Sequence, residues 1–492
     1  MKIIRYLSLS VACWILIDAC QDRNLTTANT DTGDLTSLCE PGSQYDKMPV
    51  LGLPNASTVP GGNVDSILVA FLQNRADKLS WQTFIAMNWL ATPTGMPDTT
   101  QCFGRRDGIT VWEHWMPGRE LFRSDGQPPR PWQYGLSTAG HPNNSRDAPL
   151  FRRFKLNELS QFDPDRQLVP NRHGLYTLYE VFYNRQVYDY VVGGGLYSIA
   201  GQQQFVQKWP RQPNGLYLTN ADKKTDTIGL ERLRERAYLP VGGAKDTMFT
   251  YTYNSLTSAQ LQKGQLTYYK NVGAIMLKSA WTVLTPAEDP ALYHTRVVQL
   301  NGKQVTLGLV GLHIAHKLAE APRWMWSTFE HDRNSPRVDE HGLATLKPGV
   351  DYLYFNKSRN DTSTYNKPTR RPADRTRIQV VRMQQRLNST DLINDQFHAL
   401  IRQASPKSVW LNYRLVGTQW PFSAPDALLT DGDIRPQFLA NSVIETYHQT
   451  RSSCMGCHKL AQLLADSTHH GYFADFVWGM ALQTSSSKRS DF

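Results

Sequence analysis

Apolar and polar positions follow two periods along the chain, and they predict one long early helix followed by a series of strands. Residues 64–90 place apolar side chains at helical spacing, and Pro93 and Gly95 end that stretch. Asn301-Gly302 suits the tight turn of a β-hairpin between two alternating stretches. Strand-like alternation is found in five stretches: 274–284, 295–300, 304–310, 324–330 and 409–416.

Helical spacing returns in three shorter stretches, at 181–192, 441–449 and 473–482, and a glycine turn at 193–195 ends the first of them. Strands and helices occur in separate runs, without the regular alternation of βαβ units, which favours an α+β fold. We expect a large domain with an antiparallel sheet and flanking helices, and a short helical segment at the C-terminus.

The first 19 residues have the features of an export signal. Lys2 and Arg5 precede the apolar run 7–17, and this run is shorter than the about 20 apolar residues that a permanent membrane helix needs. The run leads into Ala19-Cys20, which resembles the cleavage site of bacterial lipoproteins. Two interpretations follow: a lipid anchor at Cys20, or an ordinary secretory signal cleaved near Ala19. Both predict a periplasmic protein.

Composition divides the remainder into three parts. Residues 20–62 are rich in Thr, Asn, Asp, Gly and Pro, which is typical of a polar tether. Residues 63–435 are expected to form the large α+β domain, and 436–492 the C-terminal segment. The chain of 492 residues has a formal net charge of +10, which suits an acidic protein partner or nucleic acid. Because Lys and Arg are scattered and form no patch with aromatic residues, nucleic acid is not expected.

The most informative short pattern is Cys454-x-x-Cys457-His458. Two thiols at this spacing can each form a thioether with one vinyl group of a haem, and the adjacent histidine then reaches the iron. In a chain with 6 Cys and 13 His, roughly 0.002 matches are expected by chance. A thioredoxin-like redox pair would follow a strand of a βαβ unit, which the pattern does not indicate. The sequence therefore predicts one covalent haem c, bound by the segment 436–492.

The ligand on the opposite side of the iron has three candidates. His313 and His316 stand three residues apart, so in a helix both would face one side, and Met480 lies in the apolar stretch after the motif. For each of them an ordinary core side chain is the alternative. The two histidines together with Glu330 and His331 could instead hold a non-haem metal.

Other cysteines and several tryptophans complete the set of candidates. Cys39 and Cys102 remain once Cys13 leaves with the signal, and in an oxidising compartment they either pair or stay free. Four tryptophans are candidates for lining a haem pocket, with ordinary core packing as the alternative: Trp324, Trp326, Trp420 and Trp478.

Several stretches resemble a family of bacterial exported proteins of similar length, described as cytochrome c family proteins. The landmarks are 81–84, 111–113, 310–317, 326–330 and 453–458. The resemblance implies haem binding and no particular reaction. Small soluble cytochromes c carry the motif near the N-terminus, whereas here only residues 459–492 follow it. We therefore expect the large preceding domain to supply much of the haem pocket.

These features together lead us to expect single-electron transfer between periplasmic redox partners. The basic surface would steer a partner that has an acidic face. One alternative is a haem-dependent oxidoreductase, peroxidase- or oxidase-like, with a substrate pocket over a five-coordinate iron. Another alternative is a sensor whose haem detects a small gas.

Overall fold

The computed structural model describes most of the large domain and part of the C-terminal segment. The described residues are 38–39, 66–106, 108–132, 169–208, 239, 272–300, 303–318, 321–359, 361–368, 379–422, 429–463 and 474–481. The predicted signal, Cys20 and most of the predicted tether lie outside them. None of the helices in these ranges has the length and apolar character needed to cross a membrane.

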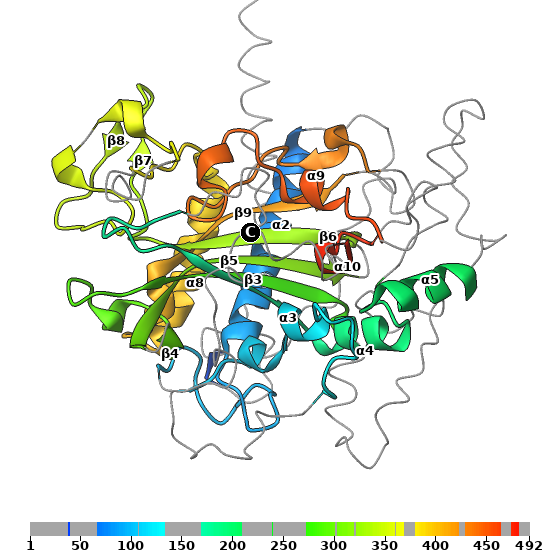
Figure 1. Cartoon of the computed structure of the whole chain (residues 1–492). Coiled ribbons are helices and arrows are strands. Elements are labelled where there is room, and N and C mark those ends of the chain that lie inside the picture. The colour runs from blue at the N-terminus through cyan, green and yellow to red at the C-terminus, as the bar shows by residue number, and fades with distance from the viewer. Residues whose placement is uncertain are drawn as a thin grey trace, which may run out of the picture.

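An antiparallel sheet forms the centre of the described structure (Figure 1). It has eight strands in the order β1-β2-β3-β5-β6-β9-β10, with β4 paired to β5 beside this path. A second, two-stranded sheet pairs β7 with β8. The strands are β1 (Met116–Pro117), β2 (Leu178–Tyr183), β3 (Ile275–Val283), β4 (Thr295–Leu300), β5 (Lys303–Leu318), β6 (Ala321–His331), β7 (Arg337–Val338), β8 (Ala344–Thr345), β9 (Tyr413–Pro421) and β10 (Ile434–Arg435).

Helices lie on both sides of this sheet, and α2 crosses behind the strands in Figure 1. The α-helices are α2 (Ser66–Asn88), α3 (Gly118–Leu121), α4 (Arg185–Gly193), α5 (Ile199–Lys208), α8 (Asn388–Ala404), α9 (Cys454–His458) and α10 (Trp478–Ala481). Short 3-10 helices are η4 (Val111–His114), η7 (Pro290–Leu292), η8 (Lys357–Arg359), η9 (Thr362–Thr364), η11 (Val409–Asn412), η12 (Asp431–Asp433) and η13 (Thr446–His448).

Side chains alternate between the two faces of each strand, so neighbouring residues of β5 enter different cores. Leu312 and Ile314 pack with Trp81 of α2 in the main core, on what we call the helix face. Ala315 packs with Met455 of α9 in a second core, on what we call the motif face. Burying one large apolar side chain contributes about 1.5–3 kcal/mol, so the two cores hold both layers firmly on the sheet.

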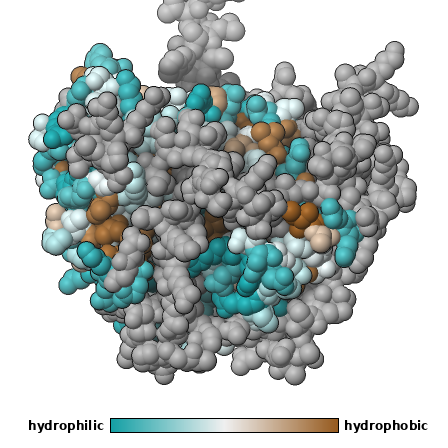
Figure 2. Space-filling view, viewed as in Figure 1, coloured by the Kyte–Doolittle hydropathy of each residue, from teal (hydrophilic) through white to brown (hydrophobic). Residues whose placement is uncertain are grey.

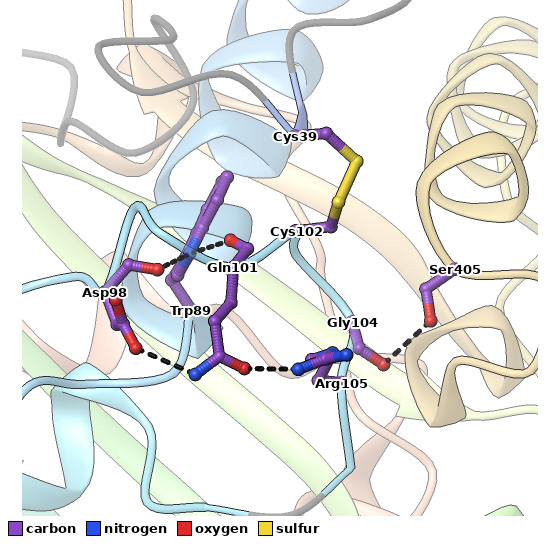
Figure 3. Close-up of a disulfide and its surroundings, with 8 residues drawn as sticks. All are labelled: Cys39, Trp89, Asp98, Gln101, Cys102, Gly104, Arg105 and Ser405. Atoms are coloured by element: carbon purple, nitrogen blue, oxygen red, sulfur yellow. Dashed lines mark hydrogen bonds between the residues drawn. A yellow bond between two sulfur atoms is a disulfide. The ribbon is translucent and has the colours of Figure 1, made fainter.

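A disulfide joins Cys39 to Cys102, with 4.0 Å between the two Cα atoms (Figure 3). The neighbouring Leu38 is fully buried in the main core, and its carbonyl accepts a hydrogen bond of 2.9 Å from the Phe103 amide. Two residues of the predicted tether are therefore attached to the large domain. Cys39 and Cys102, which the sequence left either paired or free, are paired.

The coarse prediction of an α+β fold with an antiparallel sheet and flanking helices is confirmed. The long helix, the hairpin strands and the strands at 274–284 and 324–330 are found as α2, β4, β5, β3 and β6. Three stretches differ. The predicted helix 181–192 begins as β2 before α4, the predicted strand 409–416 begins as η11, and the predicted helix 441–449 is mostly turns ending in η13. Of the predicted helix 473–482, only α10 is helical within the described residues 474–481.

Candidate functional site

The helix α9, which contains the C-x-x-C-H pattern, is fixed to the motif face by Gln419 of β9. The Gln419 side-chain amide donates to Ser453 Oγ at 3.0 Å, and its carbonyl oxygen accepts from the Met455 amide at 3.1 Å. Ser453 is the N-cap of α9, because its hydroxyl accepts from the Gly456 amide at 3.1 Å. One fully buried glutamine thus sets where the first turn of the motif lies on the sheet.

The two motif cysteines differ in exposure. Cys454 is buried beside the second core, Cys457 is exposed, and both are free thiols. Burial raises the pKa of Cys454 well above its ordinary value and also raises the pKa of Cys457. Trp478 of α10 hydrogen-bonds the Cys457 thiol. Both sulfur atoms are therefore neutral thiols at pH 7, one turned inward and one toward the surface.

His458 is the residue whose geometry is most informative. Its Nδ1 lies 2.7 Å from the Phe476 carbonyl oxygen, so Nδ1 carries a hydrogen and donates it. Its ring lies against Trp326 of β6, with 4.3 Å between the ring centroids. Burial lowers the pKa of His458 to about 4, outweighing the opposite effect of the hydrogen bond to Phe476. The imidazole is therefore neutral at pH 7, with its hydrogen on Nδ1 and a lone pair on Nε2.

A polar cluster on the motif face acts on His458 and the thiols. Lys278 of β3 and His313 of β5 are directly paired across the two strands. His313 Nε2 lies 3.0 Å and 3.1 Å from the two carboxylate oxygens of Glu445. Burial raises the pKa of Glu445, but His313, Lys278 and the Asn441 amide outweigh it and leave this pKa below its ordinary value. The charges of Lys278, His313 and Glu445 each affect His458, so the motif faces polar groups from two strands.

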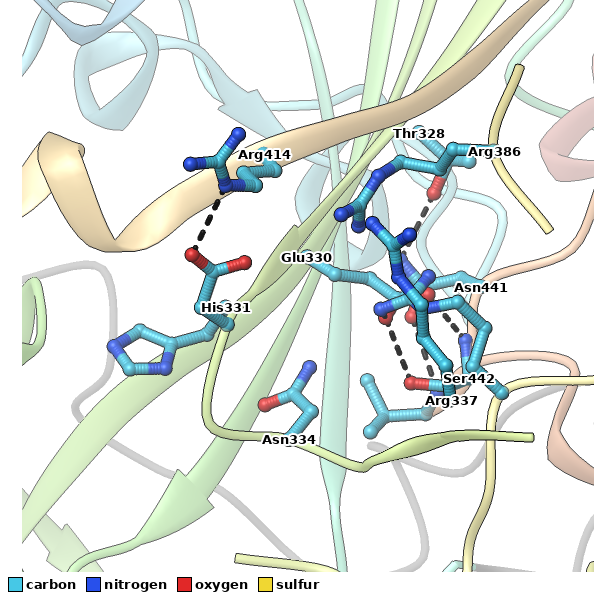
Figure 4. A network of polar contacts seen from close by, with 12 residues as sticks. Thr328, Glu330, His331, Asn334, Arg337, Arg386, Arg414, Asn441 and Ser442 are labelled. Atoms are coloured by element: carbon cyan, nitrogen blue, oxygen red, sulfur yellow. Dashed lines mark hydrogen bonds and ion pairs between the residues drawn. The ribbon is translucent and has the colours of Figure 1, made fainter. Parts of the chain in front are cut away.

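The segment that holds Glu445 is joined to β6 by hydrogen bonds, two of them to a carboxylate that also forms a buried ion pair (Figure 4). Glu330 forms an ion pair with Arg382, and its carboxylate accepts from both the amide and the hydroxyl of Ser442. Next to it, the Asn441 amide group donates to Thr328 Oγ1 at 2.9 Å. Removing one partner of such a buried pair costs about 3–5 kcal/mol, so this network holds Glu445 in place beside His313.

A pocket of about 400 Å³ opens on the exposed side of α9. Its lining includes Cys457, Gly456 and Ser453 of the motif segment together with Phe438 and Arg451. Figure 2 shows apolar residues gathered at the surface over α9. Cys457 thus lines a pocket that also contains apolar side chains, the cationic Arg451 and the anionic Asp431.

No protein-family model, curated protein or solved structure matches this chain.

Two buried polar atoms next to the motif lack hydrogen-bond partners among the described residues. These are Trp326 Nε1, a donor, and His313 Nδ1. Leaving a buried polar group unpaired costs about 1–3 kcal/mol, and in native proteins such groups are few and call for a partner such as a cofactor or a water. Both atoms belong to residues that contact or face His458. A cofactor with polar substituents, bound through His458, fits this arrangement.

The three candidates for the second axial ligand lie in different places. His313 and His316 are on β5 rather than on a helix, so residues three apart point to opposite faces and the predicted shared side is wrong. His316 lies on the helix face, where its Nε2 donates to the Val272 carbonyl at 2.8 Å and its Nδ1 contacts Thr83 Oγ1 at 3.3 Å. Met480 is fully buried in the second core. Of the three, only His313 faces the polar cluster beside the motif.

The predicted non-haem metal site is not found. Within the described ranges no three His, Cys, Asp or Glu side chains converge as metal ligands. The Glu330 carboxylate forms an ion pair with Arg382 and accepts a hydrogen bond from Ser442. His331 Nε2 donates to the Leu292 carbonyl at 3.0 Å. His313 and His316 lie on opposite faces of β5, which separates the remaining two candidates.

Three of the four tryptophans that were candidates for a haem pocket lie on the motif face, and one lies on the helix face. Trp326 contacts His458, Trp478 contacts the Cys457 thiol, and Trp324 lies behind Trp326 with 6.5 Å between ring centroids. Trp420 points to the helix face, where its Nε1 donates to Gln73 at 2.9 Å, so it does not line the site.

Sequence reasoning missed four residues that form the surroundings of the motif: Lys278, Gln419, Glu445 and the carbonyl of Phe476. One signal was present for Lys278, which is a charged residue within the apolar stretch 274–284. Gln419 and Glu445 show no distinctive local spacing, and a main-chain carbonyl has no sequence signal at all.

Proposed function

We propose that this chain is an exported haem c protein that carries out single-electron transfer. The observation that carries the proposal is the hydrogen bond from His458 Nδ1 to the Phe476 carbonyl, in a C-x-x-C-H helix whose two thiols are free. Histidines that bind iron or other metals through Nε2 donate Nδ1–H to a carbonyl or carboxylate, which fixes both tautomer and ring orientation.

The chain's own residues account for cofactor retention and orientation. Cys454 and Cys457 would hold the porphyrin through two thioethers, and His458 Nε2 would bind the iron. A haem bound there supplies a one-electron couple between ferric and ferrous iron. Trp326 packs against the His458 ring, and its unpaired Nε1–H is available to a polar substituent of the porphyrin.

Exposure at the motif supports electron transfer to a protein partner. Cys457 is exposed, Leu460 is 58% exposed, and Phe438 lines the neighbouring pocket. An apolar surface next to a redox centre suits a small, short-lived contact with another redox protein. The formal net charge of +10 suits a partner with an acidic face, met in the periplasm.

The test is to express the chain with its signal in a bacterium that attaches haem to exported proteins. We expect a pyridine haemochrome spectrum typical of two thioethers, about one haem per polypeptide, and a mass that exceeds the processed chain by one haem. Cys454→Ser with Cys457→Ser should give colourless protein, whereas Cys39→Ser with Cys102→Ser, a matched change of two cysteines, should keep the haem. Colourless wild-type protein with the bare mass would refute the proposal. The same mass reports whether Cys20 is lipidated.

A haem-dependent oxidoreductase is the second candidate, and the His313–Glu445 pair favours it. A buried histidine bonded to a carboxylate, facing the motif, is suited to moving protons during peroxide chemistry. Carbon monoxide separates the two functions. If it leaves the ferrous spectrum unchanged, both axial positions are filled and an electron carrier is supported; if it shifts the spectrum and His313→Gln lowers peroxide turnover, the oxidoreductase is supported.

A further inference from the structure

A second buried ion pair lies directly behind the residue that accepts the hydrogen bond of His458. Lys317 of β5 forms an ion pair with Asp475, and these residues are 0% and 3% exposed. The Asp475 carboxylate also accepts from the Leu239 amide at 2.7 Å and lies 3.4 Å from Trp324 Nε1. Three donors from distant parts of the chain therefore converge on one carboxylate.

The backbone at this point has an unusual conformation. Asp475 and Phe476 have positive φ angles of 44° and 69°, and Trp324, which contacts Asp475, has a φ of 75°. Residues with side chains rarely adopt this left-handed region, because each instance costs about 1–3 kcal/mol and persists only where the surrounding structure enforces it. The ion pair with Lys317 holds the Asp475 side chain in place and opposes that cost.

This conformation determines where the Phe476 carbonyl points. Asp475 immediately precedes Phe476, so the anchored carboxylate and the two left-handed residues set the direction of the peptide group that accepts from His458 Nδ1 at 2.7 Å. If residue 476 returned to an ordinary negative φ, its carbonyl would turn away from the imidazole.

We propose that Lys317 and Asp475 are positioning residues, which hold the Phe476 carbonyl on His458 and thereby lower the reduction potential of the haem. This inference rests on the proposed function. A hydrogen bond from Nδ1 makes the imidazole a more basic ligand. A more basic axial ligand favours ferric over ferrous iron, so the bond lowers the potential.

The experiment removes the pair without leaving a buried charge. Lys317→Met combined with Asp475→Asn keeps the approximate size of both side chains, and replacing a buried pair by neutral groups is often tolerated. Glu113→Gln combined with Arg296→Met is the matched control, because Glu113 and Arg296 also form a buried ion pair, in the main core beside Thr110 and His294. Trp324→Phe, which removes one donor and keeps the ion pair, is a milder variant should the double variant fail to fold.

The midpoint potential is measured by titration with dithionite, which supplies one electron to each ferric iron, alongside the haem content of each protein. We expect a positive shift in the double variant, a smaller positive shift for Trp324→Phe, and no shift in the control. Haem present in all variants with unchanged potentials, or an equal shift in the control, would overturn this inference and leave the proposed function intact. Wild-type protein without haem would overturn both.

Discussion

Replacing Gln419 by leucine removes the hydrogen bonds that fix α9 on the sheet, while it keeps a side chain of similar size. The Gln419 amide donates to the carbonyls of Pro436 and Gln437 at 2.9 Å and 3.0 Å and to Ser453 Oγ at 3.0 Å. Its carbonyl oxygen accepts from the Met455 amide at 3.1 Å. Leucine can replace none of these bonds.

The cost follows from which groups stay buried after the change. Met455 is fully buried, so its amide loses its partner, and an unpaired buried donor costs about 1–3 kcal/mol. Ser453 keeps its bond to the Gly456 amide. We therefore expect the free energy of opening the α9 layer to fall by about 2 kcal/mol, which raises the population of the open state roughly 30-fold.

Hydrogen exchange followed by mass spectrometry checks this expectation on peptides from residues 450–463. Gln379→Leu is the matched control, because Gln379 is equally buried and bridges backbone groups, accepting from the Asn356 amide at 2.9 Å and donating to the Arg359 carbonyl at 3.1 Å. We expect faster exchange at 450–463 only in Gln419→Leu. An equal increase in both variants would show that Gln419 does not specifically anchor the motif, and the reasoning would be refuted.

Three further changes have defined outcomes. Cys39→Ser with Cys102→Ser opens a link across 63 residues; loop entropy predicts a loss of about 4 kcal/mol in a denaturant titration, and no loss would contradict it. Burial lowers the pKa of His316 to about 4, below the ordinary 6.5, so only the unfolded chain binds a proton between these values and stability falls as pH drops through this window. His316→Gln should remove up to about 3 kcal/mol of this dependence and leave unchanged the visible spectrum of protein that carries the proposed haem. His313→Gln should alter the ferric spin state if His313 binds iron, and unchanged spectra would exclude it as a ligand.

The parts of the fold that could be predicted are those decided by local pattern. The helix α2 is long, rich in apolar residues and free of Gly and Pro, and β4 and β5 flank an Asn-Gly turn. The stretch 441–449 also has helical spacing, but there tertiary contacts limit the helix to single turns. The Asn441 carbonyl accepts from the Glu445 amide at 2.9 Å, while the side chains of Asn441 and Ser442 bond to Thr328 and Glu330 of β6. Local preference alone could not reveal those partners.

In the candidate site, too, the residues set by local sequence could be predicted and those set by tertiary contacts could not. Cys454, Cys457 and His458 could be named as candidates because the chemistry of thioether attachment demands their spacing in sequence. The length of one strand determines where the two histidines lie. The sequence predicts strand alternation over 304–310, whereas β5 continues to Leu318 and places His313 and His316 on opposite faces of the sheet. Glu445 reaches His313 from 132 positions away, and no sequence spacing encodes that contact.

Under the proposed function, the inward position of Cys454 would impose an order on biosynthesis. A porphyrin vinyl group can reach this sulfur only while the layer that contains it is lifted from β9, because the folded protein covers it. The strands beneath can assemble first, since their hydrogen-bonded ladder does not include the motif. If the proposed haem is attached at Cys454, its attachment therefore has to precede the final closure of the α9 layer on the sheet.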